Sequence, residues 1–295
     1  MTLLDDPAQT KPKTAGVVEW VLMDKRRMCP HCRAFITTDD RTCPYCHEAV
    51  GPRAIDRRSS SPIGGFIPQV RFNTVIILVI NFGLYIATSI YSMNAGRGSA
   101  MTLDGRTLVN FGAMFSPLIQ DGEWWRLVTA GFLHGGLLHI LMNSWVLFDL
   151  GAQVEELYGA SRMLTIYFIS NAFGFYVSSL VKQGPSIGAS AALCGLIGAM
   201  IALGVRDKTG FGAAIRAFYI RWLVYILLFS FLPGVDMAAH VGGLAGGFAI
   251  GYLAGQPRYE GSATEKLWRI SSVCCILLTA ASFLKMYLWF SRYAQ

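Results

Sequence analysis

Residues 185–203 read PSIGASAALCGLIGAMIAL, a run of small and apolar residues without charge, which is typical of a membrane-spanning or buried helix. The hydroxyl of Ser190 lies in the first turn of this predicted helix. Serine is common in contacts between membrane helices, where its hydroxyl can bond back to a carbonyl one turn away. A packing serine and a nucleophile look alike in this run, so the rest of the chain decides between them.

The composition predicts a membrane protein. Of the 295 residues, 53% are hydrophobic and 15% are charged, whereas about 25% charged residues is typical of soluble domains. The apolar residues form runs of about 20, the length that crosses about 30 Å of hydrocarbon. We attribute the net charge of +7 to basic loops at the membrane surface, and we expect no nucleic-acid partner.

Seven hydrophobic spans are predicted after Arg71, so the expected fold class is an all-α polytopic membrane protein. They cover about residues 72–92, 126–150, 161–181, 188–205, 214–232, 236–255 and 268–290. The long connection 93–125 contains tryptophans, which favour the membrane interface, so we expect it to lie against the bilayer. No cleavable signal peptide is visible, and the first span is expected to act as an uncleaved insertion signal.

Lysine and arginine are unevenly distributed along the chain. Eleven of them lie in the tail through Arg71, and the loops at about 206–221 and 258–269 are also basic. The intervening loops are poor in both residues. Basic loops stay on the cytoplasmic side of a membrane. We therefore expect a cytosolic N-terminus, and the cytoplasmic membrane of a prokaryote is the expected location.

Four cysteines in the tail form two C-P-x-C pairs within MCPHCRAFITTDDRTCPYCHEAV, namely Cys29, Cys32, Cys43 and Cys46. Two such turns present four sulfurs, which suits a tetrahedral zinc ion. The alternatives are two disulfides, which require an oxidising compartment, or a redox motif, which has no reason to occur twice in so short a segment. We therefore expect a structural Zn²⁺, with His31 and His47 beside the ligands rather than among them.

The chain divides into four parts by composition. Residues 1–50 are a tail with a zinc-ribbon-like module, and residues 51–70 are a linker rich in Pro, Gly, Ser and Arg. Residues 71–255 form a six-helix membrane core, and residues 256–295 contain a second linker and the seventh span. Three roles suit the zinc module: it binds a cytosolic partner, it binds the cytosolic part of a substrate, or it only stabilises the tail.

The second predicted span contains three polar side chains, in FLHGGLLHILMNSWVLF: His134, His139 and Asn143. Ionisable groups inside the membrane are costly and are commonly functional. His139 and Asn143 are four residues apart, so they share a helix face and together could donate hydrogen bonds to an oxyanion. The same pair could instead hold two helices together. A metal site is less well supported, because no carboxylate or cysteine stands at a suitable spacing.

The sixth predicted span, DMAAHVGGLAGGFAIGYLAG, combines a histidine with a stripe of glycines. Gly243, Gly247 and Gly251 recur every four residues, and the fourth span has a matching stripe of small residues at positions 191, 195 and 199. Such stripes allow two helices to approach closely, which would bring His240 to Ser190. A serine hydroxyl needs a neighbouring base to act as a nucleophile, so the residue types point to acyl transfer.

These residues together resemble the rhomboid intramembrane serine proteases over about residues 72–255. The resemblance rests on the Trp125–Arg126 pair and the H-x4-H-x3-N pattern in WWRLVTAGFLHGGLLHILMN, on GAQVEELYG after the second span, on GAS at 188–190, and on AHVGGLAGG around His240. Each piece is modest alone, but four in this order are specific. The resemblance implies a six-helix rhomboid-like core, to which a seventh C-terminal transmembrane helix and the zinc module are added.

The resemblance also implies a Ser–His dyad without an acidic third member. Ser190 would be the nucleophile and His240 the general base. His139, Asn143 and the backbone N–H of Ser190 would be the oxyanion donors, and a helix N-terminus suits that role. Structural roles are expected for His134, Trp125, Arg126, Gly188, Gly243 and Gly247. No cofactor is expected for catalysis, and the implied substrates are single-span membrane proteins cut in or near the lipid bilayer.

Two residues depart from the family pattern. Ala191 stands where a glycine usually follows the serine, and Cys194 replaces an aromatic residue that usually packs on the histidine. The expected function is an intramembrane serine endopeptidase. The alternative is a catalytically inactive rhomboid-like protein that binds membrane helices as an adaptor, although inactive relatives typically lack the serine or the histidine. A channel or transporter would need acidic groups or broken helices, and Asp149 is the only carboxylate deep in a predicted span.

Overall fold

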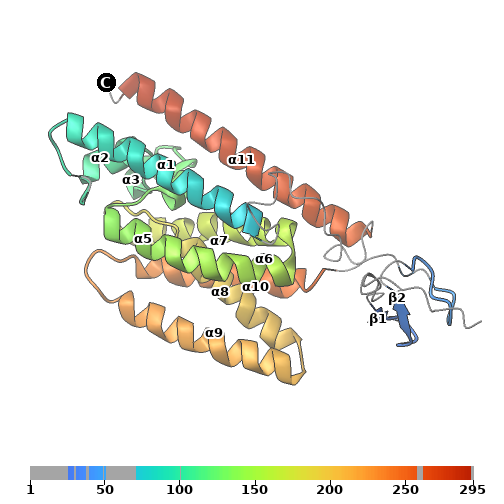
Figure 1. The fold of residues 1–295 in the computed structure, drawn as a ribbon. Coiled ribbons are helices and arrows are strands. Elements are labelled where there is room, and N and C mark those ends of the chain that lie inside the picture. Colours follow the sequence, from blue (N-terminus) through green and yellow to red (C-terminus); the bar gives the residue numbers. More distant parts are fainter. Residues whose placement is uncertain are drawn as a thin grey trace, which may run out of the picture. The chain divides into compact units, whose positions relative to one another are not determined.

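Figure 1 shows the computed structural model of the chain, which falls into two compact units, Met1–Pro52 and Arg53–Gln295. The structure describes residues 26–29, 31–37, 40–48, 50, 71–99, 101–257 and 262–293. The start of the tail, residues 1–25, and the predicted linker, residues 51–70, lie outside the described residues. Each unit is described by itself below.

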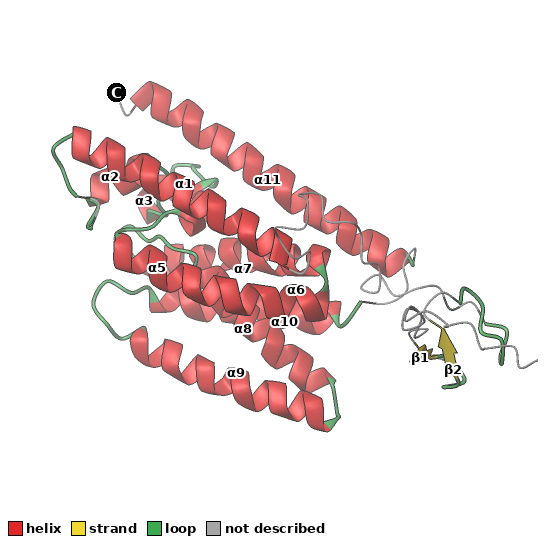
Figure 2. Cartoon of the chain, viewed as in Figure 1, coloured by secondary structure: helices red, strands yellow, loops and turns green. Residues whose placement is uncertain are grey.

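The first unit contains a small antiparallel hairpin, shown by the two yellow strands of Figure 2. Strand β1 (Arg26–Met28) pairs with β2 (Phe35–Thr37), with Arg26 opposite Thr37 and Met28 opposite Phe35. Among its described residues, the buried cluster consists of four, Cys29, Ile36, Cys43 and Val50. So small a core rarely supports a fold without a metal or disulfides.

The second unit is helical (Figure 2). Its helices are α1 (Phe72–Asn94), α2 (Gly105–Asn110), α3 (Ser116–Gln120), α4 (Arg126–Thr129), η2 (Ala130–Phe132), α5 (Leu137–Val146), η3 (Leu147–Gly151), α6 (Ala152–Tyr158), α7 (Ala160–Val181), α8 (Ser190–Arg206), α9 (Gly210–Phe229), α10 (Met237–Ala254) and α11 (Ala263–Tyr293). The segment η3 is a π-helix that joins α5 and α6 into one longer helix.

Six of these helices are long and apolar enough to cross a membrane. They are Phe72–Asn94, Leu137–Tyr158, Ala160–Val181, Gly210–Phe229, Met237–Ala254 and Ala263–Tyr293. The remaining predicted span is α8, a shorter apolar helix of 17 residues. The prediction of an all-α, multi-pass integral membrane protein is therefore confirmed.

The predicted second span, 126–150, is wrong at both ends. Residues from Arg126 to Phe132 form the short helices α4 and η2, and the long helix begins only at Leu137. The chain is extended at Gly136, where a Cβ atom would lie 2.3 Å from the Met101 carbonyl oxygen, so this close contact admits only glycine. The segment GAQVEELYG therefore lies in and just after α6, and the helix includes the buried carboxylate of Glu155.

Helix α8 lies at the centre of the helical unit. Nearly all of its residues are buried, and it packs against α7, α9 and α10. Figure 1 shows α9 on the outer side of α8. Because α8 does not face lipid along its length, a helix of 17 residues is sufficient at this place.

Helix α11 lies at the periphery (Figure 1). It packs against α7 and α4. Its only buried residues are Glu265, Ser272 and Ser282. Near one end, Glu265 forms a two-point ion pair with Arg162 of α7, with both N···O distances 2.6 Å. Near the other end, the Phe290 ring lies 5.4 Å from that of Tyr91 in α1. The seventh helix is thus attached to the core at both ends.

Candidate active site

Helices α8 and α10 approach each other closely along the two stripes of small residues. A Cβ atom on Gly243 would lie 2.0 Å from the Ala191 carbonyl oxygen, and one on Gly247 would lie 1.9 Å from that of Gly195. A Cβ atom on Gly251 would lie 2.6 Å from the Cα atom of residue 199. These distances are shorter than any real Cβ contact, so the two backbones touch only because glycine stands there.

The order of these contacts shows that α8 and α10 run in the same direction. Residue 191 faces Gly243 and residue 195 faces Gly247, so both helices begin at the same end of the pair. Ser190 is the first residue of α8, and His240 lies in the first turn of α10. The structure therefore places Ser190 and His240 at the same end of the helix pair. Within the described residues no hydrogen bond joins their side chains, and catalytic hydrogen bonds commonly tighten only when substrate binds.

The backbone before Ser190 is fixed by its neighbours. Residues Met114 and Ser186 form an antiparallel bridge, with N–H···O distances of 3.0 and 2.8 Å. The N–H of Gly188 donates to the Ala130 carbonyl oxygen at 3.0 Å. Gly188 has a φ of +116°, a conformation that residues with a side chain rarely adopt. The turn into α8 therefore requires glycine at this position.

The ring of His139 lies directly over Gly188. A Cβ atom built on Gly188 would lie 2.7 Å from His139 Nε2 and 3.7 Å from Ser190 Oγ. The N–H of Gly135 points at His139 Nδ1, at 3.4 Å. This nitrogen is thus the acceptor, so a neutral His139 carries its proton on Nε2, the atom that faces the site. His139, the predicted oxyanion donor, thus lies beside Gly188, two residues before Ser190.

Asn143 lies one turn further along α5 and is only 7% exposed. Its side-chain nitrogen donates to the His139 carbonyl oxygen at 2.9 Å. An amide nitrogen carries two hydrogens, so this bond fixes the side chain and leaves one hydrogen for another acceptor.

His134 is fully buried, and its ring meets the His139 ring edge-on, with the ring centres 5.1 Å apart. In the described part of the chain neither ring nitrogen of His134 has a hydrogen-bond partner.

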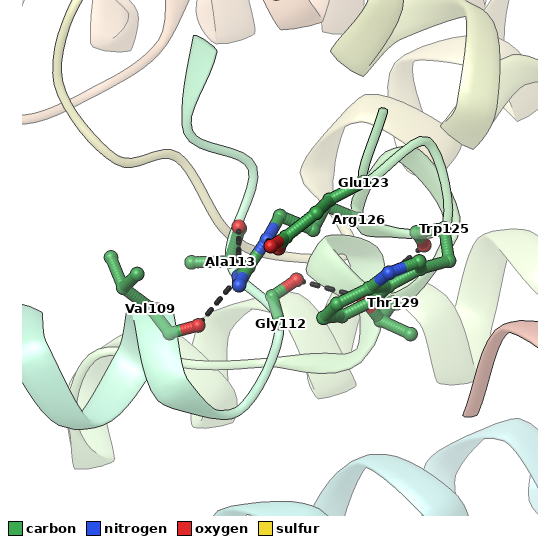
Figure 3. Close-up of polar contacts among 7 residues, drawn as sticks. All are labelled: Val109, Gly112, Ala113, Glu123, Trp125, Arg126 and Thr129. Carbon is green, nitrogen blue, oxygen red and sulfur yellow. Dashed lines mark hydrogen bonds and ion pairs between the residues drawn. The ribbon is translucent and has the colours of Figure 1, made fainter. Parts of the chain in front are cut away.

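Trp125 and Arg126 hold the long first loop together (Figure 3). The Arg126 side chain is fully buried, and it pairs with Glu123 and donates to the carbonyl oxygens of Val109 and Ala113. Its guanidinium carbon lies 4.4 Å from the centre of the Trp125 ring. A buried arginine that bonds several carbonyls fixes the loop between its short helices α2 and α3. These contacts of the two residues all lie within the first loop.

Two residues near His240 were not singled out from the sequence. Ser230, which follows α9, has its Oγ 2.6 Å from His240 Nδ1. Asp236 caps α10 by accepting the Ala239 N–H at 3.0 Å, and it also accepts from Ser178 Oγ. Burial raises the pKa of Asp236, but these hydrogen bonds outweigh burial and hold it below the ordinary value. An aspartate before a predicted helix is a visible cap signal, whereas nothing in the sequence marks Ser230.

The four cysteines of the tail form a candidate metal centre. Their sulfur atoms all lie within 4.8 Å of one another, with Cys29 and Cys46 3.7 Å apart and Cys32 and Cys43 3.6 Å apart. Four sulfurs bound to tetrahedral zinc at about 2.3 Å lie about 3.8 Å apart. The cluster can therefore hold a metal ion of this size.

The two cysteine turns have the same backbone. Arg33 donates its N–H to the Cys29 carbonyl oxygen, and His47 donates to that of Cys43, each at 2.9 Å. Arg33 and His47 both have φ near +60°, four residues after the first cysteine of each pair. Both side chains are exposed, as is that of His31. The two predicted histidines thus lie outside the sulfur cluster.

The thiol pKa values also favour a bound cation. Burial raises the pKa of Cys29, but the N–H groups of Cys32 and His31 outweigh it and bring the value to about 6. The Glu48 N–H lowers the pKa of Cys46, but burial and the neighbouring thiols outweigh it and raise the value to about 12. The Cys29 thiol therefore loses its proton readily, whereas the negative charge of one thiolate opposes ionisation of its neighbours. Four thiolates at this spacing need a positive ion to balance their charge.

Comparison with known proteins agrees with this architecture. Residues 121–257 match the family model of the Rhomboid domain. The chain is 36% identical to "Rhomboid protease GluP" of Bacillus subtilis (strain 168) over 205 residues, which is 68% of this chain and 39% of the relative. It is 39% identical to "RHOMBOID-like protein 5" of Arabidopsis thaliana over 159 residues, 52% of each chain.

A third relative carries a different name. The chain is 34% identical to "Inactive RHOMBOID-like protein 8" of Arabidopsis thaliana over 141 residues, which is 46% of this chain and 40% of the relative. The alignments thus span about half or less of the length of these three relatives. The membrane core is a rhomboid domain, in a multi-pass protein with a cysteine cluster in its tail. The chain is therefore a member of the rhomboid family, in which some relatives are named proteases and one is named inactive.

Proposed function

We propose that this chain is an intramembrane serine endopeptidase that cleaves transmembrane segments of membrane proteins by a Ser–His dyad. The observation that carries the proposal is the close, same-direction contact of α8 and α10, which puts Ser190 and His240 at one end of the helix pair. A relative named as a protease supports it. No cofactor has a part in the proposed chemistry.

In the proposed reaction, His240 Nε2 takes the proton of Ser190 Oγ while that oxygen bonds to the carbonyl carbon of the peptide. The carbonyl oxygen becomes an anion and accepts hydrogen bonds from His139 Nε2, Asn143 Nδ2 and the Ser190 N–H. The C–N bond then breaks, and His240 gives its proton to the leaving amine. Water, deprotonated by His240, attacks the acyl group. The bond to Ser190 Oγ then breaks, and His240 returns the proton to that oxygen.

The proposed substrates are single-span membrane proteins within the lipid bilayer. The N-terminus is proposed to be cytosolic, in the cytoplasmic membrane of a prokaryote, because the tail and two alternate loops are basic. Counting the spans from a cytosolic N-terminus, α8 and α10 both begin on the other side of the membrane. Ser190 and His240 would then lie near water, which hydrolysis requires.

The cysteine cluster is proposed to hold one structural Zn²⁺. Its support is the match between the sulfur spacing and that of tetrahedral zinc. A cytosolic partner of this module is a further part of the proposal, since the cluster lies in a compact unit of its own. The zinc would take no part in peptide cleavage.

A second candidate function is a catalytically inactive protein that binds membrane helices as an adaptor. One relative is named inactive, and two residues of the site depart from the usual pattern. Ala191 and Cys194 are both buried, at 0% and 2% exposed, so both are packed inside the helical unit. This observation and the presence of both dyad residues favour the protease.

The test is cleavage in proteoliposomes that hold the full chain and a single-span test protein with a helix-breaking residue and a tag at each end. We expect two tagged fragments with the wild type. Ser190→Ala and His240→Ala should give none, although each unfolds at the wild-type temperature. Cleavage by Ser190→Ala would contradict the dyad. Capture of the test protein without cleavage by a folded wild type would favour the adaptor.

A further inference from the structure

Ser230 is placed to act on His240. It is the first residue after α9, and it is 4% exposed, while His240 is 7% exposed. The Ser230 Oγ lies 2.6 Å from His240 Nδ1 and 2.7 Å from the Ile226 carbonyl oxygen. The backbone of Ser230 is also fixed, since its N–H donates to the same carbonyl at 2.9 Å. The hydroxyl therefore has one position and two partners.

The two partners decide where the protons lie. A carbonyl oxygen only accepts hydrogen bonds, and a hydroxyl has one hydrogen to donate. Two oxygens 2.7 Å apart need that hydrogen between them, so the hydroxyl hydrogen of Ser230 points at Ile226. The lone pair that faces His240 must then accept, and Nδ1 must be the donor. A neutral His240 therefore carries its proton on Nδ1 and leaves Nε2 free.

A free Nε2 is the form that a general base needs. In serine proteases with a triad, a buried aspartate selects this tautomer and orients the ring. Asp236 does not serve here, because its hydrogen bonds go to Ala239 N–H and Ser178 Oγ, whereas His240 Nδ1 is bonded to Ser230. The side chain four residues after Ser190, where the family usually has an aromatic residue on the histidine, is Cys194. Both usual ways of holding the ring are thus missing.

We infer that Ser230 is a positioning residue, which fixes the tautomer and the orientation of His240 through a neutral hydroxyl. The inference rests on the proposed dyad for its effect on cleavage, but the tautomer itself can be observed without any cleavage. Because Ser230 directly follows α9, the end of this helix would also hold His240 in position. It also explains how an imidazole without an acidic partner is held in place.

The first experiment is ¹⁵N NMR of the full chain in detergent with labelled histidine. The signals of His240 are assigned by their loss in His240→Ala. We expect a protonated Nδ1 and an unprotonated Nε2 in the wild type, and a shift toward protonated Nε2 in Ser230→Ala. A wild-type His240 with its proton on Nε2 would overturn the inference, whether or not the protein cleaves peptides.

The second experiment compares cleavage kinetics of Ser230→Ala, Ser230→Thr and Ser282→Ala. Ser282 is a matched control, because it is a buried serine that bonds the carbonyl four residues earlier, in α11, without touching a histidine. Loss of the tautomer-setting aspartate from a triad costs about 10⁴-fold in kcat, and for a neutral hydroxyl we expect a loss of at least about tenfold.

In these kinetics KM should change little in Ser230→Ala, and Ser230→Thr, which keeps the hydroxyl, should recover most of kcat. Ser282→Ala should match the wild type. Equal kcat in Ser230→Ala and wild type, at equal thermal stability, would overturn the role in positioning. A wild type that does not cleave, but shows the expected NMR signals, would refute the proposed protease and leave the assignment of the tautomer standing.

Discussion

At the scale of single residues, Gly188 determines how close His139 comes to the serine. Its φ of +116° excludes most side chains, and a Cβ atom there would lie 2.7 Å from His139 Nε2. Any side chain at this position would both strain the turn and push the imidazole away from Ser190. The expected oxyanion site thus depends on a residue that touches no substrate.

Asn143→Ala tests the oxyanion donors. We expect kcat to fall on the order of 10²-fold, because one preorganised donor to the developing anion is lost. KM should change less, since the anion exists only in the transition state. Met142→Ala is a suitable control, because its side chain is 47% exposed on the same helix. Equal losses in both variants would mean that Asn143 only supports the helix.

The residues of the candidate site differ in how far the sequence predicts them. Ser190, His139, Asn143 and His240 are polar groups in apolar runs, which is an unusual pattern and therefore an informative one. Ser230 lies at the end of an apolar run, where serine is common. Its role depends on the end of α9 lying beside α10, and that contact between separate helices leaves no local pattern.

At the scale of helices, the stripes of small residues in α8 and α10 were readable because their spacing of four residues matches the helical repeat. The start of the second span, by contrast, could not be predicted from the sequence. The apolar run after Arg126 suggested a membrane helix, yet that arginine is buried in the loop, where it bonds carbonyl oxygens. Hydropathy cannot distinguish a loop folded against the helices from a helix in lipid.

Gly247→Ala tests the helix contact. The added Cβ atom would lie 1.9 Å from the Gly195 carbonyl oxygen, so α8 and α10 must move apart. We expect a loss of stability of about 1–3 kcal/mol and a fall in activity, measured by thermal unfolding and cleavage. Gly83→Ala in α1 is the matched control, because nothing lies within 4 Å of its added Cβ. Equal behaviour of the two variants would argue against the close contact.

Glu265→Ala tests how α11 is held. Its partner Arg162 is buried, with a side chain 2% exposed, so removal of the carboxylate leaves an unpaired charge. Breaking a buried ion pair costs about 3–5 kcal/mol, and we expect a clear drop in the unfolding temperature. Lys266→Ala, at the next residue, should have little effect. A stable Glu265→Ala variant would mean that the aromatic contacts of α11, such as those of Phe283, Trp289 and Phe290, hold the helix without the ion pair.

At the scale of the whole molecule, the chain combines two units with different sources of stability. The membrane unit has large buried clusters around α8, whereas the cluster in the tail has four buried residues, two of which are cysteines. The CxxC spacing predicted that the tail has a different source of stability, because paired cysteines so close in sequence indicate a metal-dependent fold. No comparable pattern in the sequence identifies the proposed partner of the module.

Metal analysis tests the tail. We expect about one zinc per chain, since four thiolates fill one tetrahedral site, and Cys43→Ser should lower the zinc content to background. Cys275→Ser is the control, because that cysteine lies in α11 outside the cluster, and it should keep its zinc. Zinc retained in Cys43→Ser, or no zinc in the wild type purified without chelator, would contradict the assignment of the metal centre.

The central claim is that Ser190 is a nucleophile activated by His240, and covalent labelling tests it most directly. The full chain in detergent is treated with a fluorescent fluorophosphonate, beside Ser190→Ala and His240→Ala, and the adduct is located by peptide mass. The account predicts that only the wild type is labelled and that the adduct is on Ser190. Labelling of Ser190→Ala to the wild-type level, or a well-folded wild type that takes no label, would contradict it.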